Sequence, residues 1–317
     1  MSGLKVLITG GSSFTGTWFV KSLAKAGHDV TAVLTREDAS AYSELRGRRV
    51  QELSQHCQPV FGSSFGDDQF LQLIKSVKPD VLCHHGADVT NYRSPDFDYH
   101  RAVATNTCRI DEVLQAMQDV GSNRVVITGS VFEGGEGAGS ENLPHFSPYG
   151  LSKALSARVF EHFCQQAEFS LGKFVIPNPF GPLEEPRFTA YLVRTWRAGE
   201  TPCVNTPAYI RDNIHVSLMA QHYAHFVTNL SCDAGFAKTN PSGYVESQGG
   251  FAQRFAREMQ SRLDMPCQVD LAHQTEFSEP RIRVNTDALD ATALDWDETT
   301  AWDEIGKYYA SLEVANS

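Results

Sequence analysis

The chain has 317 residues, 41% of them hydrophobic, and its 27 basic and 38 acidic residues give a formal net charge of −11. This composition excludes collagen and a disordered chain, and the length predicts about two domains. No apolar run approaches the roughly 20 residues that span a bilayer, and the N-terminus lacks a signal-peptide pattern, so we expect a cytoplasmic protein without a membrane partner. An acidic chain without a basic tract also argues against a nucleic-acid partner. Seven cysteines scattered singly, with no CxxC pair, predict neither a disulfide framework nor a metal site.

Short β-rich runs alternate with longer helical patterns in the first half of the chain. Strands this apolar on both faces are typical of a parallel sheet covered by helices, so we predict an α/β fold with a doubly wound, Rossmann-type sheet. The predicted strands are Leu4–Thr9, Val30–Leu34, Cys57–Phe61, Val81–His84, Val125–Thr128 and Lys173–Ile176, and the predicted helices are Phe14–Ala26, Phe97–Val120 and Tyr149–Ala167.

The pattern changes near residue 177. Pro, Gly and Arg accumulate in loops, and helical segments follow without a strand between each of them, near Thr189–Ala198, Ser217–Thr228 and Gly250–Leu263. We therefore predict a Rossmann domain over residues 1–177 and a smaller α/β substrate domain over residues 178–317. The chain is expected to cross back to the sheet near residues 204–216.

A glycine-rich segment follows the first predicted strand and opens a helix. Its residues are Gly10, Ser12, Ser13, Phe14, Thr15 and Gly16. Glycines let the backbone turn tightly and approach a pyrophosphate, whose charge the helix N-terminus stabilises. A short motif of this kind is also compatible with a plain tight turn, but its place in a βαβ unit favours a dinucleotide-binding loop.

The end of the second predicted strand indicates which dinucleotide is bound. An acidic residue there would accept hydrogen bonds from the ribose hydroxyls of NAD, but this chain has Leu34 at that place and Arg36 two residues later. A guanidinium can hold a 2′-phosphate through paired hydrogen bonds. NADP is therefore the preferred cofactor, with NAD possible because Glu37 and Asp38 reduce the local positive charge.

Three further residues form a second pattern. Tyr149 and Lys153 lie four apart and share one face of a predicted helix, and Thr128 ends the fifth strand, at the carboxyl edge where doubly wound folds bind ligands. A phenol with a pKa near ~10 becomes a useful acid or base when an ammonium stabilises its phenolate. We expect Tyr149 to transfer a proton, Lys153 to tune it and Thr128 to orient the reacting oxygen. A Tyr and Lys at this spacing also occur on ordinary helix surfaces, but the glycine loop beside them favours catalysis.

Together with Asn106, these features resemble the extended short-chain dehydrogenase/reductase family, in particular its nucleotide-sugar epimerases, dehydratases and reductases. The resemblance covers nearly the whole chain and includes the segments Pro177–Pro182 and Arg211–Val216. It implies that Asn106 and Lys153 contribute to the cofactor site and that the protein forms a homodimer. It also implies a nucleoside-diphosphate sugar as substrate, whose diphosphate is held by the residues Asn178 and Arg211, with Arg187 and Arg281 as weaker candidates.

The chain departs from the family pattern in two places. Ser13 stands where the family has its middle glycine, which is expected to re-angle the cofactor. Dehydratases carry an acid just after the catalytic threonine, whereas this chain has Gly129 and Ser130 there, so a 4,6-dehydratase is disfavoured unless Glu133 or Glu136 substitutes. The glycine-rich segment 134–140 is either a flap over the sugar or a flexible surface loop.

The sequence therefore predicts an NADP-dependent oxidoreductase acting on a nucleoside-diphosphate sugar, with 4-keto-sugar reduction as the favoured activity because of Arg36. The alternative is a redox-neutral 4-epimerase with tightly bound NAD(P), which is the commoner activity in the family. A catalytically silent, NADP-binding regulatory protein is a more distant alternative, because the set Thr128, Tyr149 and Lys153 is intact.

Overall fold

The computed structural model describes residues 3–314, and the chain divides into two compact units. The first comprises the residues up to Glu136, Pro144–Ile176 and Ala220–Asn240; the second comprises Gly137–Leu143, Pro177–Met219 and the residues from Pro241 onward. One change of unit falls between residues 176 and 177. Residues 220–240 belong again to the first unit, and residues 210–215 form a strand in a sheet of the second unit.

The first unit contains a seven-stranded sheet whose neighbouring strands are all parallel, in the order β11-β7-β5-β4-β1-β2-β3. The strands are β1 (Lys5–Thr9), β2 (Asp29–Val33), β3 (Gln58–Val60), β4 (Val81–His84), β5 (Arg124–Ser130), β7 (Ser170–Ile176) and β11 (Gly235–Thr239). The predicted Rossmann-type fold is therefore confirmed. The strand β11 was not predicted, because it lies at the sheet edge and most of its residues are not buried.

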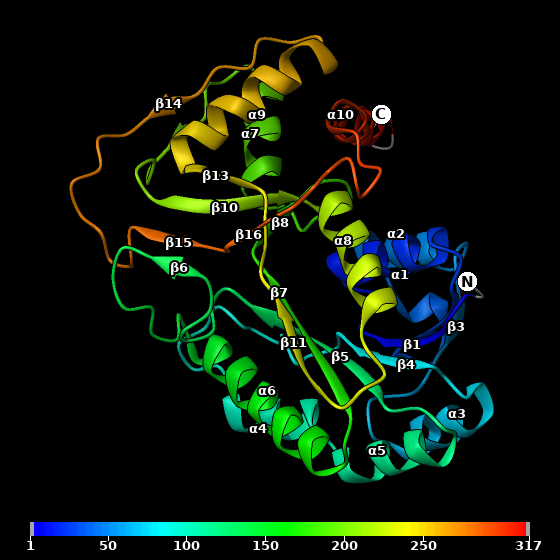
Figure 1. Ribbon diagram of the computed structural model, residues 1–317. Coiled ribbons are helices and arrows are strands. Elements are labelled where there is room, and N and C mark those ends of the chain that lie inside the picture. Colours follow the sequence, from blue (N-terminus) through cyan, green and yellow to red (C-terminus); the bar gives the residue numbers. More distant parts are fainter. Residues whose placement is uncertain (1–2, 315–317) are drawn as a thin grey trace. The chain divides into compact units, whose positions relative to one another are not determined.

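Helices cover both faces of this sheet (Figure 1). On one face lie α1 (Phe14–Lys25), α2 (Glu44–Leu53) and the part of α8 (Val216–Asn229) that belongs to this unit; on the other lie α3 (Asp68–Val77), α4 (Tyr99–Asn106), α5 (Ile110–Asp119) and α6 (Pro148–Gln166). The single helix expected over residues 97–120 is interrupted between α4 and α5. Arg109 has a φ of +47° there, and its guanidinium pairs with the carboxylates of Asp68 and Glu112.

Aromatic side chains fill the space between the sheet and its helices. On one face the rings of Phe19 and Tyr223 stack with centroids 3.9 Å apart. On the other face Phe160 of α6 is 2% exposed and packs against Phe65 and His84, with centroids 5.8 and 5.3 Å away. The α6 helix, which carries Tyr149 and Lys153, is thus fixed to the sheet by its buried aromatic residue.

The second unit has a smaller sheet in the order β13-β10-β15-β6, with β8 also paired to β10. Its strands are β6 (Ala138–Gly139), β8 (Asn178–Phe180), β10 (Ile210–His215), β13 (Tyr244–Ser247) and β15 (Ile282–Val284), and its helices include α7 (Phe188–Arg197), α9 (Gln248–Arg262) and α10 (Glu298–Val314). Trp302 of α10 packs against Phe180 and Phe255 in the core of this unit. Across residues 3–314, no helix is long and apolar enough to span a membrane.

Replacing Phe160 by alanine tests how α6 is held. Phe160→Ala is expected to lower the free energy of unfolding by about 3–5 kcal/mol, because it leaves a cavity between α6 and the sheet. Gln165 lies on the same helix and is exposed, so Gln165→Ala should change the free energy of unfolding by only about 0.5 kcal/mol. Urea unfolding followed by circular dichroism measures both values. Equal losses in the two variants would contradict the packing described here.

Candidate active site

The glycine loop connects β1 to α1 and leaves no room for larger residues at its two ends. Gly10 has a φ of +76°, and a Cβ on it would lie 2.7 Å from the backbone nitrogen of Gly86. A Cβ on Gly16 would lie 2.2 Å from the carbonyl oxygen of Gly10. Glycine is therefore required at both positions. This tight turn at the start of a twelve-residue helix has the shape and polarity that fit a dinucleotide pyrophosphate.

Ser13 caps the helix that follows this loop. Its φ of −79° is one that any residue adopts, so its backbone does not require glycine. Its hydroxyl donates to the carbonyl of Gly10 (2.9 Å) and accepts from the N–H of Gly16 (3.1 Å). The Ser13 side chain thus points back to the loop and serves as an N-cap, which explains how the chain accommodates a serine at this place.

Two histidines follow at the carboxyl end of β4 and make different connections. His84 bonds the hydroxyl of Thr9 through Nδ1 and the carbonyl of Asn106 through Nε2, both at 2.9 Å. His85 bonds the hydroxyl of Thr128 through Nδ1, at 2.9 Å. Burial, reinforced by the charge of Lys153, lowers the pKa of each histidine to about 3. Both imidazoles are therefore neutral at physiological pH.

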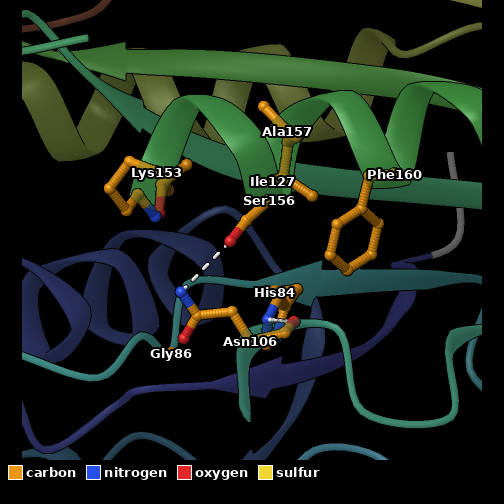
Figure 2. Close-up of a pocket in the computed structure, with 9 residues that line it drawn as sticks. His84, Gly86, Asn106, Ile127, Lys153, Ser156, Ala157 and Phe160 are labelled. Atoms are coloured by element: carbon orange, nitrogen blue, oxygen red, sulfur yellow. Dashed lines mark hydrogen bonds between the residues drawn. The ribbon is translucent and has the colours of Figure 1, made fainter. Parts of the chain in front are cut away.

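A cavity lies between the end of β4, the end of β5 and helix α6 (Figure 2). It brings together three of the residues predicted from the sequence, Thr128, Lys153 and Asn106. Its lining comprises His84, Gly86, Asn106, Ile127, Thr128, Lys153, Ser156, Ala157 and Phe160. The Asn106 amide donates to Ser156 (3.3 Å) and accepts from the N–H of Asp88 (2.9 Å), so it joins α4 to α6 and to the loop after β4.

Lys153 and Tyr149 lie one turn apart at the start of α6. Burial lowers the pKa of Lys153 to about 8; the charge of Lys173 adds to this decrease, and the charge of Glu133 opposes it. The Tyr149 ring is half-buried and meets the rings of Tyr92 and Phe97 edge to face, at 5.3 and 5.9 Å. The contacts with these two aromatic rings therefore orient the Tyr149 ring.

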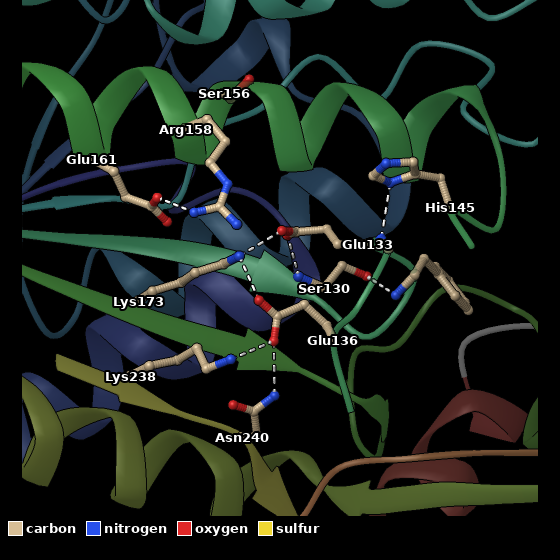
Figure 3. A network of polar contacts seen from close by, with 12 residues as sticks. Ser130, Glu133, Glu136, His145, Ser156, Arg158, Glu161, Lys173, Lys238 and Asn240 are labelled. Atoms are coloured by element: carbon tan, nitrogen blue, oxygen red, sulfur yellow. Dashed lines mark hydrogen bonds and ion pairs between the residues drawn. The ribbon is translucent and has the colours of Figure 1, made fainter. Parts of the chain in front are cut away.

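A buried ion network joins β7 to the loop after β5 (Figure 3). The Lys173 ammonium is 2.6 Å from a Glu133 carboxylate oxygen and 2.7 Å from a Glu136 oxygen, and Glu136 also binds Lys238 and Asn240. Burial by itself would raise the pKa of Glu136, but Lys173, Asn240 and Lys238 outweigh it and lower that pKa. Sequence reasoning considered the two glutamates only as possible dehydratase acids.

The ion network has two consequences for the sequence predictions. The carboxylate of Glu133 also accepts the N–H of Ser130 at 2.8 Å, and both glutamate side chains are bound to Lys173. Neither carboxylate is placed as the extra acid of a dehydratase. The segment 134–140 is anchored at Glu136, which argues against a loop that is flexible along its whole length.

Arg36 lies just beyond β2 and has a neighbour that the sequence analysis did not single out. The guanidinium groups of Arg36 and Arg46 lie 5.5 and 5.8 Å from the ring centre of Tyr42. Arg46 belongs to α2, which was not predicted, and its Nε donates to the hydroxyl of Ser12 in the glycine loop (3.3 Å). The carboxylate of Asp38 is turned to the backbone N–H groups of Ser40 and Ala41, so it accepts local hydrogen bonds next to the arginine pair.

The four predicted substrate residues lie in the second unit. Arg211 of β10 pairs with Glu279 (2.7 Å) and donates to three backbone carbonyls of its own unit. Asn178 of β8 donates to the carbonyl of Asp212 (3.1 Å). Arg187 and Arg281 are exposed, and the guanidinium of Arg281 lies 4.0 Å from the ring centre of Phe277.

Replacing Lys173 tests the buried network. Lys173→Met leaves two buried carboxylates without their cation, and we expect the free energy of unfolding at neutral pH to fall by about 3–5 kcal/mol. The side chain of Lys238 is 40% exposed, so the matched variant Lys238→Met should lose only about 0–1 kcal/mol.

The same network predicts a pH dependence. Because folding lowers the pKa of Glu136, its stabilising contribution is complete above its ordinary pKa of 4.5 and is lost as the pH falls further. Urea unfolding curves between about pH 3 and 7 should show this loss in the parent protein and a weaker dependence in Glu136→Gln. An unchanged dependence in that variant would assign the effect to other carboxylates.

Comparisons with known proteins agree with this architecture. Residues 6–234 match the model of the NAD dependent epimerase/dehydratase family. The UDP-glucose 4-epimerase of Thermotoga maritima, solved with UDP-glucose, has a TM-score of 0.71 at 17% identity, with 98% of this chain and 99% of that chain covered. The UDP-glucuronic acid 4-epimerase of Bacillus cereus, solved with UDP-glucuronic acid and NAD, has a TM-score of 0.72 at 15% identity, with 98% and 100% covered.

A sequence relative carries a different activity in its name. The 2-alkyl-3-oxoalkanoate reductase of Stenotrophomonas maltophilia is 28% identical over 163 residues, which span 48% of this chain and 44% of that protein. The family match extends over most of the chain, from β1 to the loop before β11. The chain therefore belongs to the NAD dependent epimerase/dehydratase family.

Proposed function

We propose that this enzyme uses NADPH to reduce a keto group of a nucleoside-diphosphate sugar, at C4 of the sugar. The observation that carries the proposal is the pair Arg36 and Arg46 beside Tyr42, at the end of β2 where NAD-binding proteins carry an acid. Two guanidinium groups at this place can hold a 2′-phosphate with paired, charge-assisted hydrogen bonds. NADPH is the usual donor for net reduction, which favours reduction over a redox-neutral reaction.

Thr128 and Lys153, which line the cavity, and Tyr149, one helical turn before Lys153, supply the remaining chemistry. The bound nicotinamide supplies the hydride for the carbonyl carbon of the substrate. Tyr149 gives its phenolic proton to the carbonyl oxygen, so that the ketone becomes an alcohol. Lys153, whose pKa is lowered to about 8, stabilises the resulting phenolate and holds the nicotinamide ribose. Thr128, near the end of β5, accepts a hydrogen bond from the hydroxyl that the reacting oxygen becomes.

The substrate assignment has a specific competitor. Asn178, Arg187, Arg211 and Arg281 are proposed to hold the diphosphate, which agrees with the UDP-sugars named for the structural neighbours. In this structure, however, Arg211 is already paired with Glu279 and must exchange that partner for a phosphate. This pairing, with the name of the 28%-identical relative, favours a 2-alkyl-3-oxoalkanoate-like substrate as the second candidate. In both cases the reaction is reduction of a ketone.

Two further points belong to this proposal. A redox-neutral 4-epimerase would use the same residues and keep its NAD(P) bound, and it is the alternative activity on nucleotide sugars.

We also propose a homodimer formed through α4 and α6, which pack together on one face of the sheet. The exposed Leu155 of α6 is an apolar residue that such an interface would cover.

Replacing the arginines beside Tyr42 tests the cofactor assignment. Arg36→Ala and Arg46→Ala should each weaken NADPH binding roughly 10- to 100-fold, because each removes charged hydrogen bonds to the 2′-phosphate. The affinity for NADH, which lacks this phosphate, should stay unchanged in Arg36→Ala and change less than that for NADPH in Arg46→Ala, which also loses the contact with Ser12. Titrations that follow protein fluorescence measure the dissociation constants of NADPH and NADH for the parent protein and for both variants. If the parent protein binds NADPH and NADH equally, the cofactor argument for a reductase is lost.

A substrate panel tests the reaction itself. The purified enzyme is mixed with NADPH and a UDP-4-keto-sugar, UDP-glucose or a 2-alkyl-3-oxoalkanoate, and the absorbance of the reduced nicotinamide is followed. We expect oxidation of NADPH with the keto-sugar and a rate lower by roughly 10²–10⁴-fold in Tyr149→Phe, with NADPH affinity retained.

The other outcomes of the panel identify the alternatives. Turnover with the oxoalkanoate alone identifies the second substrate class. Conversion of UDP-glucose to its C4 epimer without a net absorbance change identifies an epimerase. Full activity in Tyr149→Phe would show that another group supplies the proton.

A further inference from the structure

One imidazole connects hydroxyl groups from two segments that are far apart in the sequence. His85 meets Thr128 at the end of β5 through Nδ1 (2.9 Å). Its Nε2 meets Ser13 (3.0 Å) and Thr15 (2.9 Å) in the glycine loop. All four residues belong to the first unit. His85 therefore links the loop that is proposed to bind the pyrophosphate with the threonine that is proposed to contact the substrate.

The preceding residue, His84, shows how the donor and the acceptor nitrogen of such a ring can be told apart. The Nε2 of His84 meets the carbonyl oxygen of Asn106, which can only accept, so this nitrogen carries the proton. The Nδ1 of a neutral His84 is then an acceptor and receives the hydroxyl proton of Thr9. Thr9 in turn accepts the N–H of Gly86 at 2.9 Å. The donor and the acceptor are therefore assigned in each of these three hydrogen bonds.

The same accounting of hydrogen-bond donors and acceptors indicates which ring nitrogen of His85 carries the proton. The single hydroxyl proton of Ser13 is donated to the carbonyl of Gly10, so Ser13 can only accept from Nε2. The Nε2 atom of His85 therefore carries the proton, which is shared between Ser13 and Thr15. In the neutral ring Nδ1 has a lone pair and accepts from the Thr128 hydroxyl. Thr128 consequently has its only proton committed to His85.

We propose that His85 is a positioning residue that orients the Thr128 hydroxyl as a hydrogen-bond acceptor toward the substrate and ties this orientation to the glycine loop. The inference rests on the proposed function. An alcohol can donate a hydrogen bond to Thr128 held in this way, whereas a ketone cannot. As hydride adds to the carbonyl carbon and the Tyr149 proton goes to the oxygen, the new hydroxyl gains a partner in Thr128. His85 neither gains nor loses a proton in this step.

The surroundings of His85 allow the hydrogen bonds of its two ring nitrogens to be removed separately. Its ring packs edge to face on Phe19, with centroids 5.0 Å apart, so His85→Phe keeps this aromatic contact and removes both polar atoms. His85→Asn places an amide where Nδ1 stood and retains the reach to Thr128. His85→Gln places an amide where Nε2 stood and retains the reach to Ser13 and Thr15.

Nitrogen NMR on histidine-labelled protein tests the polarity without any substrate. The two His85 resonances are assigned by their absence in His85→Phe. We expect a protonated Nε2 and a lone pair on Nδ1 between about pH 6 and 8, with no titration in that interval. A proton on Nδ1, or a doubly protonated ring, would overturn the proposal. This result does not depend on whether the proposed reaction is correct.

Kinetics on the substrate identified by the panel test the positioning. His85→Phe and His85→Gln should lower kcat roughly three- to tenfold, whereas His85→Asn should retain most of the kcat of the parent protein. The KM for NADPH should rise in His85→Phe and His85→Asn but less in His85→Gln, because only glutamine keeps the loop contact.

A double-mutant comparison separates positioning from a general structural effect. In a Thr128→Val background, His85→Phe should cause no further loss of kcat, because the hydroxyl that His85 orients is already absent. Equal losses of kcat in both backgrounds would show that His85 acts only on the fold, and the proposal would fail. If no ketone in the panel is reduced, the proposed function fails, and the NMR result alone decides the polarity of Thr128.

Discussion

The site depends on one constraint, the parallel alignment of three adjacent strands, β1, β4 and β5. Thr9 of β1 is in register with His84 of β4, and His84 is in register with Ile127, which precedes Thr128. Because parallel strands end at the same edge of the sheet, side chains from three distant parts of the sequence meet there. The hydroxyls and imidazoles at these strand ends then bond one another across the strands.

Electrostatics around this edge favour a lysine that ionises near neutral pH. Burial and the charge of Lys173 both lower the pKa of Lys153, whereas the charge of Glu133 limits the decrease. Glu133, which neutralises Lys173 together with Glu136, therefore also acts on the pKa of Lys153. Removing water from these charges is costly, and the close contacts of Lys173 with both carboxylates offset that cost. The network thus stabilises the loop after β5 and sets the electrostatic environment of α6.

The glycine loop shows how a departure from a family pattern is accommodated. Ser13 replaces a glycine, but its hydroxyl bonds within the loop and to His85. Thr15 makes a second bond to the same imidazole. The polar residues at positions 13, 15 and 85 therefore form one arrangement. A single substitution in this group would leave a partner without its hydrogen bond, which is costly in a partly buried place.

The sequence alone determined the Rossmann-type fold, because runs such as Val81–His84 are apolar on both faces and alternate with helical segments. It also indicated that Thr128 lies near the carboxyl edge of the sheet and that Tyr149 and Lys153 share one helix face, since strand ends and four-residue helical spacing are local features. Tertiary structure decided the rest. The break at Arg109, the strand β11 and the partners of Lys173 depend on contacts between distant segments. The hydrogen bonds of His85 could not be predicted, because their direction depends on which protons its neighbours have already donated, and those neighbours meet only in the folded sheet.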